Sequence, residues 1–557
     1  MKIKEDNMRY QELVDVYEAI AATTKRLEKT DILADFFKKV NVETLPKVVL
    51  MALGTVFPPW SEEEQGLADK LLMKAIADVV GTPVTSVDDQ VREQGDIGGA
   101  ACELYKKKSQ TTFFFKPLEI DFVFGNLRKI AKISGDKSQS KKIAIVLELL
   151  SSATGTEAKY IARTILEELR IGVGEGTIRD AIALAFNLDK DVIDRAHMLT
   201  NDLGLIAKVA KEKGEEGLKQ LNLSPGKPVK PMLAQLSEGI AISIGEMEEA
   251  ICETKYDGIR LQIHKKDDEI NLFTRRLENV SLAIPEMIEY IKKSFPNEDF
   301  IAEGEIIATK NNKPVSFQYI LQRVRRKHNI EKAIENVPLK LFLFDLLYFK
   351  KSMIDEPLAI RRSTLEEIVD TTSHQINLSE MVKVSCENVD DASNLFNKSI
   401  AEGHEGIMIK DPKEPYIPGL RGKKMLKFKA EPETLDVVVV GGTHGIGKRA
   451  HFIGSYKVAI KDENDELKNL AHVATGLDDE TLAHLSDLMN KYKTYEKGTI
   501  IEVEPKIILE IAYSEIVKSP EYEAGFSLRF PVVKRVRKDK SLSDIDTVER
   551  LKSMFKG

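Results

Sequence analysis

The segment with the densest chemistry in this chain is ETKYDGIR, residues 253–260. Lys255 ends a predicted strand and is followed by Asp-Gly, so it lies at a bend where Gly258 lets the backbone approach a ligand. Arg260 points from the next predicted strand. The pattern K-x-D-G is short and occurs by chance, and a charged surface hairpin explains this segment when it is taken alone.

Further charged segments follow along the chain. They are FTRR (273–276), AEGEII (302–307), LFDL (343–346), EGIMIK (405–410), LKFK (426–429), and RFP (529–531) followed by KRVRKDK (534–540). In this order and at these separations they resemble the motif series of the covalent nucleotidyltransferases, most closely the archaeal-type ATP-dependent DNA ligases. Two earlier segments, 169–186 and 193–204, also resemble that family. One position departs from it, since Met425 stands where the family usually carries a tryptophan.

The resemblance implies that Lys255 is the nucleophile that takes AMP from ATP. An ordinary lysine has a pKa of about 10.4 and is almost entirely protonated at neutral pH, so attack on phosphorus requires a lowered pKa. A bound divalent metal and a cluster of bases are the expected cause; the bases are Arg421, Lys423, Lys424, Lys427 and Lys429. Burial would act in the same direction, and the sequence does not separate the two causes.

The resemblance also implies a nucleotide pocket around Lys255. Its expected members at the nucleoside are Glu253 and Thr254 near adenine, Phe344 against the base, and Arg260 and Glu305 at the ribose. Arg275 is expected at the nucleotide or the nick phosphate, and Glu305 and Glu405 at Mg²⁺ or Mn²⁺. Further expected ATP-binding residues are Arg421 and Lys427, with Lys410 and Lys429 as additional phosphate contacts. Arg276 could be confused with Arg275. Phe344 lies in a run that is apolar on both faces, so an ordinary buried strand residue remains the alternative. Asp345 in the same run needs a partner or a metal-linked network, because an unpaired buried carboxylate is costly.

Two arginines near the C-terminus have a separate implied role. Arg535 and Arg537 are two residues apart and should share a strand face, with Arg529 close by. By resemblance they orient the pyrophosphate leaving group during the first step, where delocalised cations stabilise developing charge. They lie in a different predicted domain from Lys255, so the mechanism implies domain motion. A basic strand held by surface ion pairs is the alternative.

The elements that carry these residues suggest three domains. Apolar residues recur at three- and four-residue spacing over residues 1 to about 215, which predicts helices. The proline-rich segment 221–235 marks a boundary. Alternation from Ile259 to His264 then predicts a strand, with a turn at residues 267–268 and a partner strand beyond it. We therefore expect an all-α DNA-binding domain (1–225), an α+β adenylation domain (226–431) and an all-β domain (432–557).

Two finer expectations concern the outer domains. In the last domain, about five strands and a helical stretch at 481–489 favour an oligonucleotide-binding (OB) barrel. The expected strands are 435–445, 455–462, 499–505, 506–516 and 530–537. In the first, GVGEGTIRDA (172–181) has Thr177-x-x-Asp180, which predicts a capping-box helix start that aims backbone N–H groups at a phosphate. Together with the resemblance and the nearby Arg170 and Arg179, we interpret it as a sequence-independent contact to the duplex backbone.

Composition narrows the class of protein. The chain has 557 residues, of which 42% are hydrophobic and 31% charged, and a net charge of −7. These values are typical of a globular protein with several domains, and the charge does not exclude a polyanionic partner. The three cysteines are far apart, which argues against a disulfide framework and a Cys₄ zinc site. No long apolar run or signal-like segment is present, so we expect a soluble intracellular protein. The resemblance implies that its compartment is the cytoplasm of a prokaryotic, archaeal-type cell.

A short segment before residue 118 suggests a partner. Residues 106–117 read KKKSQTTFFFKP, and Gln110, Phe113 and Phe114 resemble the peptide with which replication proteins dock on the sliding clamp. Three exposed phenylalanines would form an apolar patch that calls for an explanation. The alternative is that Phe113 to Phe115 anchor a loop on the helical core.

The combined prediction is a monomeric ATP-dependent DNA ligase that seals nicks in duplex DNA during replication, repair and recombination. An RNA ligase or a capping guanylyltransferase shares the lysine chemistry, but the long helical region and the C-terminal basic motif argue against both. An NAD-dependent ligase is disfavoured because its cysteine-based zinc module is absent from the sequence. A non-catalytic nick-binding protein is the alternative from another class, and the retained Lys255 with its carboxylates and lysines argues against it.

Overall fold

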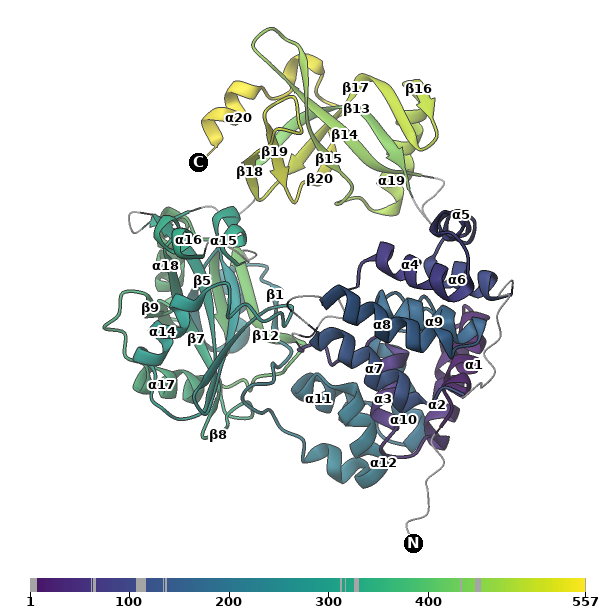
Figure 1. Ribbon diagram of the computed structural model, residues 1–557. Coiled ribbons are helices and arrows are strands. Elements are labelled where there is room, and N and C mark those ends of the chain that lie inside the picture. The colour runs from purple at the N-terminus through teal and green to yellow at the C-terminus, as the bar shows by residue number, and fades with distance from the viewer. Residues whose placement is uncertain are drawn as a thin grey trace. The chain divides into compact units, whose positions relative to one another are not determined.

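The computed structural model consists of two compact units, Met1–Phe428 and Lys429–Gly557 (Figure 1). It describes residues 8–61, 63, 67–106, 117–133, 135, 138–310, 313–315, 317–324, 330–430, 433–445 and 452–555. Within these ranges, none of the helices combines the length and apolar character that a membrane crossing requires.

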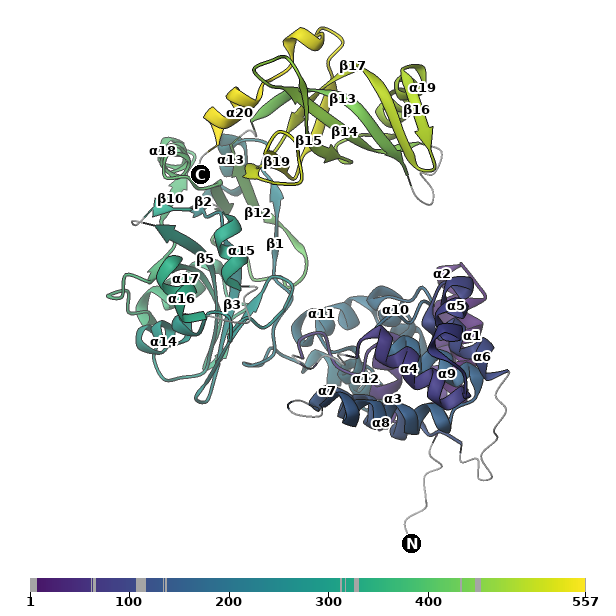
Figure 2. The same cartoon turned by 45° about the horizontal axis from the view of Figure 1, so that its top comes forward.

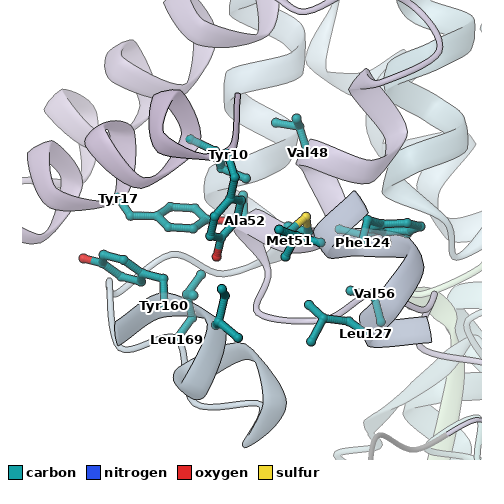
Figure 3. Close-up of a cluster of buried hydrophobic side chains, with 14 of the residues drawn as sticks. Tyr10, Tyr17, Val48, Met51, Ala52, Val56, Phe124, Leu127, Tyr160 and Leu169 are labelled. Atoms are coloured by element: carbon teal, nitrogen blue, oxygen red, sulfur yellow. The ribbon is translucent and has the colours of Figure 1, made fainter. Parts of the chain in front are cut away.

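Over the residues that the structure describes, the elements of the first part of unit 1 are helices, which confirms the prediction. Its helices are α1 (Tyr10–Ala21), α2 (Arg26–Lys39), α3 (Leu45–Ala52), α4 (Asp69–Val80), α5 (Val84–Gln94), α6 (Ile97–Tyr105), α7 (Ile120–Lys132), α8 (Ser138–Ser151), α9 (Gly155–Ile165), α10 (Glu175–Phe186), α11 (Lys190–Thr200) and α12 (Leu203–Lys219). The periodic apolar residues form one core, in which the Tyr17 and Tyr160 rings lie 4.9 Å apart between α1 and α9. Figure 3 shows Met51, Phe124 and Leu127 in the same cluster.

The predicted capping box at Thr177 is wrong. Helix α10 begins at Glu175, and its N-cap is Gly174, which contributes no side chain. Thr177 is therefore inside the first turn and buried, and Asp180 pairs with Arg26 at 2.7 Å. A glycine can cap a helix almost as well as serine or threonine, and this is why the helix starts three residues earlier than the side-chain pattern suggested.

Two sheets follow the helices in unit 1. The five-stranded sheet has the order β1-β12-β11-β2-β10, with β1 (Leu233–Leu236), β2 (Glu249–Lys255), β10 (Met381–Ser385), β11 (Gly406–Lys410) and β12 (Arg421–Lys429). Figure 2 shows α13 (Ile240–Met247) and α18 (Val389–Ala401) beside β2 and β10. The core between these helices and the sheet contains Cys252, Ile407 and Leu426.

The seven-stranded sheet has the path β4-β3-β5-β7-β8, with β6 and β9 pairing β5 and β7. Its strands are β3 (Ile259–Lys266), β4 (Glu269–Thr274), β5 (Phe300–Lys310), β6 (Lys313–Pro314), β7 (Leu339–Phe349), β8 (Lys351–Ser352) and β9 (Ile376–Leu378). Its helices are α14 (Pro285–Ser294), α15 (Phe317–Val324), α16 (Ile330–Asn336) and α17 (Leu358–Ile368). The β3–β4 hairpin, with its turn at residues 267–268, confirms the prediction.

Alternation places charged residues on the inner faces of both sheets. On β2, β11 and β12 the apolar residues face α13 and α18, so Glu253, Lys255, Lys410 and Lys427 lie on the opposite face. On β3 and β5, Leu261 and Ala302 face a second core, which leaves Arg260 and Glu303 on the other face. The Lys410 ammonium lies 4.9 Å from the Phe344 ring on β7, so these two charged faces meet.

Unit 2 is rich in strands, as predicted, but differs in detail. It contains β13 (Thr434–His444), β14 (Ile453–Lys461), β15 (Leu467–Val473), β16 (Lys493–Lys497), β17 (Ile500–Ala512), β18 (Glu515–Lys518), β19 (Phe526–Arg529), β20 (Val532–Val536), α19 (Asp479–Lys491) and α20 (Val548–Met554). Helix α19 confirms the predicted helical stretch. The prediction missed β15, β16 and β19, and the main sheet, β15-β14-β13-β17-β16 with β20 on β17, forms no closed ring among the described strands.

The prediction also divided β17 into two strands at Pro505. In the structure the register with β13 jumps from Val439↔Ile507 to Gly441↔Glu502. Proline cannot donate a ladder hydrogen bond, but it is tolerated where the ladder is interrupted. The strand therefore passes through Pro505 without ending.

Candidate active site

Lys255 lies at the end of β2, opposite Gly406 of β11. Its Nζ is 2.7 Å from Oε2 of Glu405, and its backbone carbonyl accepts a hydrogen bond from the Glu405 N–H at 2.9 Å. Both side chains are about one quarter exposed, at 22% and 27%. The amine is therefore held by one carboxylate and remains within reach of a ligand.

The bend after Lys255 packs tightly against β5. A Cβ added at Gly258 would lie 2.3 Å from the carbonyl oxygen of Ile306, closer than atoms can approach. Gly258 thus allows the bend to approach a neighbouring strand, whereas the sequence suggested that it lets the backbone approach a ligand. The Tyr256 ring stacks on Phe342 of β7 at 4.1 Å, which fixes the bend from the other side.

Glu253, two residues before Lys255, is almost fully buried. Its Oε2 accepts a hydrogen bond from Lys410 Nζ at 2.6 Å, and its Oε1 lies 3.6 Å from Arg362 of α17. Oε1 has no hydrogen-bond donor among the described residues. The structure therefore brings Glu253 and Lys410 together as a buried pair and leaves one acceptor oxygen available.

Phe344 lies between two cations. The guanidinium of Arg260 is 5.4 Å from its ring centroid, and the Lys410 ammonium is 4.9 Å away. The ring is only half-buried and belongs to none of the hydrophobic clusters, whereas its neighbour Leu343 is fully buried. These observations favour the ligand-facing interpretation of Phe344 over an ordinary core position.

Arg260 is fixed by several groups. It donates to Glu303 Oε2 at 2.6 Å and to the carbonyl of Met232 at 2.8 Å, and it lies 3.3 Å from the hydroxyl of Tyr416. Glu303 is fully buried, so this is an ion pair in a low-dielectric environment. Glu303 is thus the ion-pair partner of Arg260. On the same strand, the negative charge of Glu305 is less completely compensated.

Burial raises the pKa of Glu305 to about 7. The positive charges of Lys255 and Arg260 oppose this rise, while the carboxylates of Glu405 and Asp257 add to it. Glu305 therefore lies within electrostatic range of both Lys255 and Glu405. The spacing of Glu303 and Glu305 on one strand face predicts that their two carboxylates converge on one place. In the structure Glu303 pairs with Arg260, and the carboxylates that act on Glu305 are those of Glu405 and Asp257.

Asp345 has the partner that a buried carboxylate was expected to need. Arg361 of α17 binds both carboxylate oxygens, through Nε at 2.8 Å and through a terminal nitrogen at 3.0 Å. Burial tends to raise the pKa of Asp345, but Arg361 outweighs this and holds that pKa below its ordinary value. Asp345 is thus a structural anchor directly after Phe344.

The basic residues of β12 have different surroundings. Lys427 shares the inner face with Lys255, whereas Lys424 pairs with the buried Asp411 at 2.8 Å. Lys429 follows Lys427 on the same face, and Arg421 and Lys423 are exposed near the start of the strand. Met425 is partly buried against a small cluster that includes Met232 and Tyr416, so it takes part in packing at the position where the family usually has a tryptophan.

Arg275 reaches the same region from the end of β4. It lines a small hollow with Arg260, Gln262 and Glu303, and it is exposed. Arg276 is also exposed and belongs to the turn, where its N–H donates to the hydroxyl of Thr274. The structure therefore places Arg275 beside the predicted pocket.

The C-terminal arginines lie in unit 2. Arg535 and Arg537 both approach Glu510, at 2.6 and 3.5 Å, so they share a face as predicted. Arg535 is 64% exposed, whereas Arg537 is 12% exposed and also pairs with Asp436 and Asp539. Arg529 pairs with Glu515 at 3.4 Å and lies against the exposed ring of Phe530. The ion pairs of the alternative interpretation are thus present, and Arg535 is the most accessible of the three.

One group of predicted residues is not part of the described structure, and two residues near the pocket were not predicted. Gln110, Phe113 and Phe114 lie outside the described residues. Arg361 and Arg362, by contrast, are near the pocket but were missed. Arg362 donates to the carbonyl and hydroxyl of Ser379, where the chain crosses from β9 to β10. Two adjacent buried arginines in a helix were the only available signal, and amphipathic spacing alone does not show that both are buried.

Comparison with known proteins identifies three family models along the chain. The model described as ATP dependent DNA ligase domain matches residues 231–429, DNA ligase N terminus matches 9–183, and ATP dependent DNA ligase C terminal region matches 449–540. A DNA ligase of Methanobrevibacter smithii is 63% identical over 98% of this chain and 100% of its own length. A DNA ligase of Methanothermobacter thermautotrophicus is 59% identical over 98% of both chains.

A solved structure titled Pmar-Lig_PreS3 has a similar fold. Its TM-score is 0.56, with 18% sequence identity over 94% of this chain and 99% of that one. At this identity the likeness concerns the fold alone.

Replacing Arg361 by methionine should destabilise unit 1 by about 3–5 kcal/mol near neutral pH, because it leaves the buried Asp345 carboxylate unpaired. In the parent protein folding lowers the pKa of Asp345, so the pair stabilises the fold at pH values above the unfolded pKa of this carboxyl, about 3.9. This contribution to stability is lost as the pH falls through the pKa of Asp345 in the folded protein. In the variant the buried carboxyl can take up a proton, so the penalty should shrink as the pH falls from 8 to 5. Urea unfolding at several pH values measures this.

Arg92 is the matched control, since it pairs with Asp88 on the surface of α5. Its methionine variant should change the free energy of unfolding by less than about 1 kcal/mol at every pH. Equal losses in the two variants, or a penalty for Arg361→Met that does not depend on pH, would contradict the anchor role of the pair.

Proposed function

The chain belongs to the family of ATP-dependent DNA ligases, and from this premise we propose that it seals nicks in duplex DNA through a lysyl-AMP intermediate on Lys255. The Lys255 amine attacks the α-phosphorus of ATP, a P–N bond forms, and pyrophosphate leaves. AMP then passes to the 5′-phosphate at the nick. The 3′-hydroxyl finally attacks that phosphate, and AMP is released as the phosphodiester bond forms.

The observation that carries this proposal is the position of Lys255. It is a partly exposed amine, 2.7 Å from a carboxylate, on a face that also presents Glu253 and Lys410. Glu405 can orient the amine and accept its proton, because it already lies within hydrogen-bond distance. A charged surface hairpin would not need this shared inner face.

The surrounding residues suit a nucleotide. Glu253 Oε1, which has no hydrogen-bond donor among the described residues, can accept a hydrogen bond from the exocyclic amine of adenine, and the half-buried ring of Phe344 can stack on the base. We assign Arg260 and Glu305 to the ribose, and Arg275 to the nucleotide or the nick phosphate. Arg421, Lys410, Lys427 and Lys429 are assigned to the phosphates, where cations stabilise the charge that develops during transfer.

A divalent metal, Mg²⁺ or Mn²⁺, fits the carboxylates of Glu305 and Glu405. Burial is the main reason for the raised pKa of Glu305, and the negative charges of Glu405 and Asp257 add to it. Mg²⁺ commonly binds through one or two carboxylates together with substrate phosphates, so two protein ligands suffice. When bound, the metal would neutralise charge on the phosphates.

We divide the chain into a helical DNA-binding domain (1–225), an adenylation domain (226–431) and a C-terminal domain (432–557) for which we propose an OB fold. The change from helices to strands after α12 and the unit boundary between Phe428 and Lys429 support this division. We propose that Arg535 and Arg537 orient the pyrophosphate, which requires the C-terminal domain to close on the nucleotide and to open for DNA.

Nicked duplex DNA is the proposed partner, bound by a monomer in the cytoplasm. We also propose that Gln110, Phe113 and Phe114 dock on a sliding clamp. Docking would raise the concentration of the enzyme at a nick without a change in the active site.

Replacing Lys255 by alanine should abolish the covalent AMP adduct while the fold is retained, because no adjacent residue supplies an equivalent amine. The measurement is incubation with α-labelled ATP and Mg²⁺, followed by denaturing electrophoresis and a thermal melt. Lys398→Ala is the control, since Lys398 is a surface lysine paired with Glu380; it should label normally. Undiminished labelling of Lys255→Ala would contradict the assignment of Lys255 as the nucleophile.

Arg535→Ala should lose self-adenylation by at least tenfold yet seal DNA that is supplied already adenylated, because the proposed task of Arg535 ends with pyrophosphate release. Arg535 is the sharper test than Arg537, whose three carboxylate partners also hold the fold of unit 2. Single-turnover assays of both steps make the comparison. Equal losses in both steps would indicate DNA binding or a structural role instead.

The variant with Phe113 and Phe114 both changed to alanine should bind the clamp at least tenfold more weakly and seal nicks normally without it. Surface plasmon resonance and a clamp-free sealing assay measure the two effects. Unchanged clamp affinity, or loss of folding, would favour the core-anchor alternative for this segment.

A further inference from the structure

The segment Gly226–Met232, which we call the strap, joins the helical part of unit 1 to the sheets. Its backbone is hydrogen-bonded to side chains of β3. The Gly226 N–H donates to His264 Nδ1 at 3.1 Å, and the Val229 N–H donates to Gln262 Oε1 at 2.7 Å. These side chains follow Arg260 at alternate positions on β3, so the strap lies along the same face as the pocket arginine.

Gln262 is the centre of this network. Its Oε1 also lies 2.8 Å from His264 Nε2, and its Nε2 donates to the carbonyl of Val229 at 3.2 Å and to Glu303 Oε1 at 3.1 Å. His264 must carry its proton on Nε2, because Nδ1 accepts from the strap; burial lowers its pKa to about 3, which keeps the ring neutral. Both ends of the Gln262 amide are therefore satisfied, in a side chain that is only 3% exposed.

The network ends on Arg260. Glu303 uses one oxygen for Gln262 and the other for Arg260, at 2.6 Å. The carbonyl of Met232, the last residue of the strap, accepts from Arg260 at 2.8 Å. Tyr416 accepts from the Met232 N–H at 2.9 Å and lies 3.3 Å from Arg260. Each of these three hydrogen-bond partners of Arg260 thus belongs to the strap or is bonded to it or to Gln262.

The other side of the strap is also held. The Lys230 N–H donates to the carbonyl of Met198 at the end of α11, and Lys230 Nζ binds Glu175 of α10 at 2.6 Å. The strap is therefore bonded on one side to the helices and on the other to β3. A segment held on both sides can fix the direction of a guanidinium, which a single ion pair leaves free to rotate.

We infer that Gln262 is a positioning residue for Arg260: it fixes the strap and Glu303, and through them the orientation in which Arg260 meets the nucleotide. The inference rests on the proposed nucleotide contact of Arg260. Neither the motif segments of the sequence nor the proposed roles of the pocket residues include Gln262.

A double-mutant cycle on the full chain tests this inference. The rate of self-adenylation at subsaturating ATP is measured for the parent, Gln262→Met, Arg260→Ala and the double variant. Gln262→Met should lower the rate about tenfold, the size expected for lost hydrogen bonds around a charged group. In the Arg260→Ala background the same change should have less than about a twofold effect, because its target is gone.

Tyr416→Phe is the second variant and keeps the cycle informative if Gln262→Met fails to fold. It removes only the hydroxyl that contacts Met232 and Arg260, and it should show the same loss of effect in the Arg260→Ala background. Arg323→Met is the control. Arg323 is buried, as Gln262 and Tyr416 are, but it binds Ala283 and Glu286 away from the pocket. Any effect of this control should be the same in both backgrounds.

The outcomes separate the inference from the proposed function. Full additivity of Gln262→Met and Tyr416→Phe with Arg260→Ala would overturn the positioning role. Normal self-adenylation by Arg260→Ala would instead overturn the nucleotide contact assigned to Arg260. Non-additivity in both cycles, with additivity in the Arg323 control, would support the inference.

Discussion

Charge compensation within each sheet of unit 1, and between the seven-stranded sheet and α17, is the constraint on which the candidate site depends. Glu253 with Lys410, Glu303 with Arg260, and Asp345 with Arg361 are buried or nearly buried pairs. A buried charge without a partner would be costly, so each pair determines where its strand or helix can lie. The ion pairs therefore fix charged side chains on the facing sides of the two sheets, and the large apolar clusters lie on their outer faces.

This arrangement divides the charged residues into two groups. The paired and buried groups hold the site in place, while Lys255, Glu405 and Glu305 are less buried and remain available to a ligand. Phe344 is uncharged, but it is also partly exposed and available to a ligand, although its strand neighbours are buried. In unit 2 the same contrast distinguishes the exposed Arg535 from Arg537, which three carboxylates surround. Partial exposure, more than residue type, separates the candidate chemical groups from their supports.

Local pattern in the sequence was sufficient for much of the fold. Helical periodicity determined the first part of unit 1, and alternation from Ile259 to His264 determined the β3–β4 hairpin. Residue spacing also indicated that Arg535 and Arg537 share a face. It failed where backbone context overrides side-chain type: Gly174 caps α10 in place of Thr177, and β17 continues through Pro505 because its ladder is interrupted there.

The sequence by itself determined which residue types stand beside Lys255 and in what order the charged segments follow, because both are local properties of the chain. Only the tertiary structure decided which charged side chains pair with one another. Glu303 and Glu305 are equivalent in pattern, yet one binds Arg260 and the other lies near Lys255 and Glu405. Arg361 and Arg362 enter the site from a helix far from Lys255 in the chain, and Gln262 binds Val229 and Glu303 on other segments. Such partners are set by the register and packing of distant strands, which spacing along the chain does not encode.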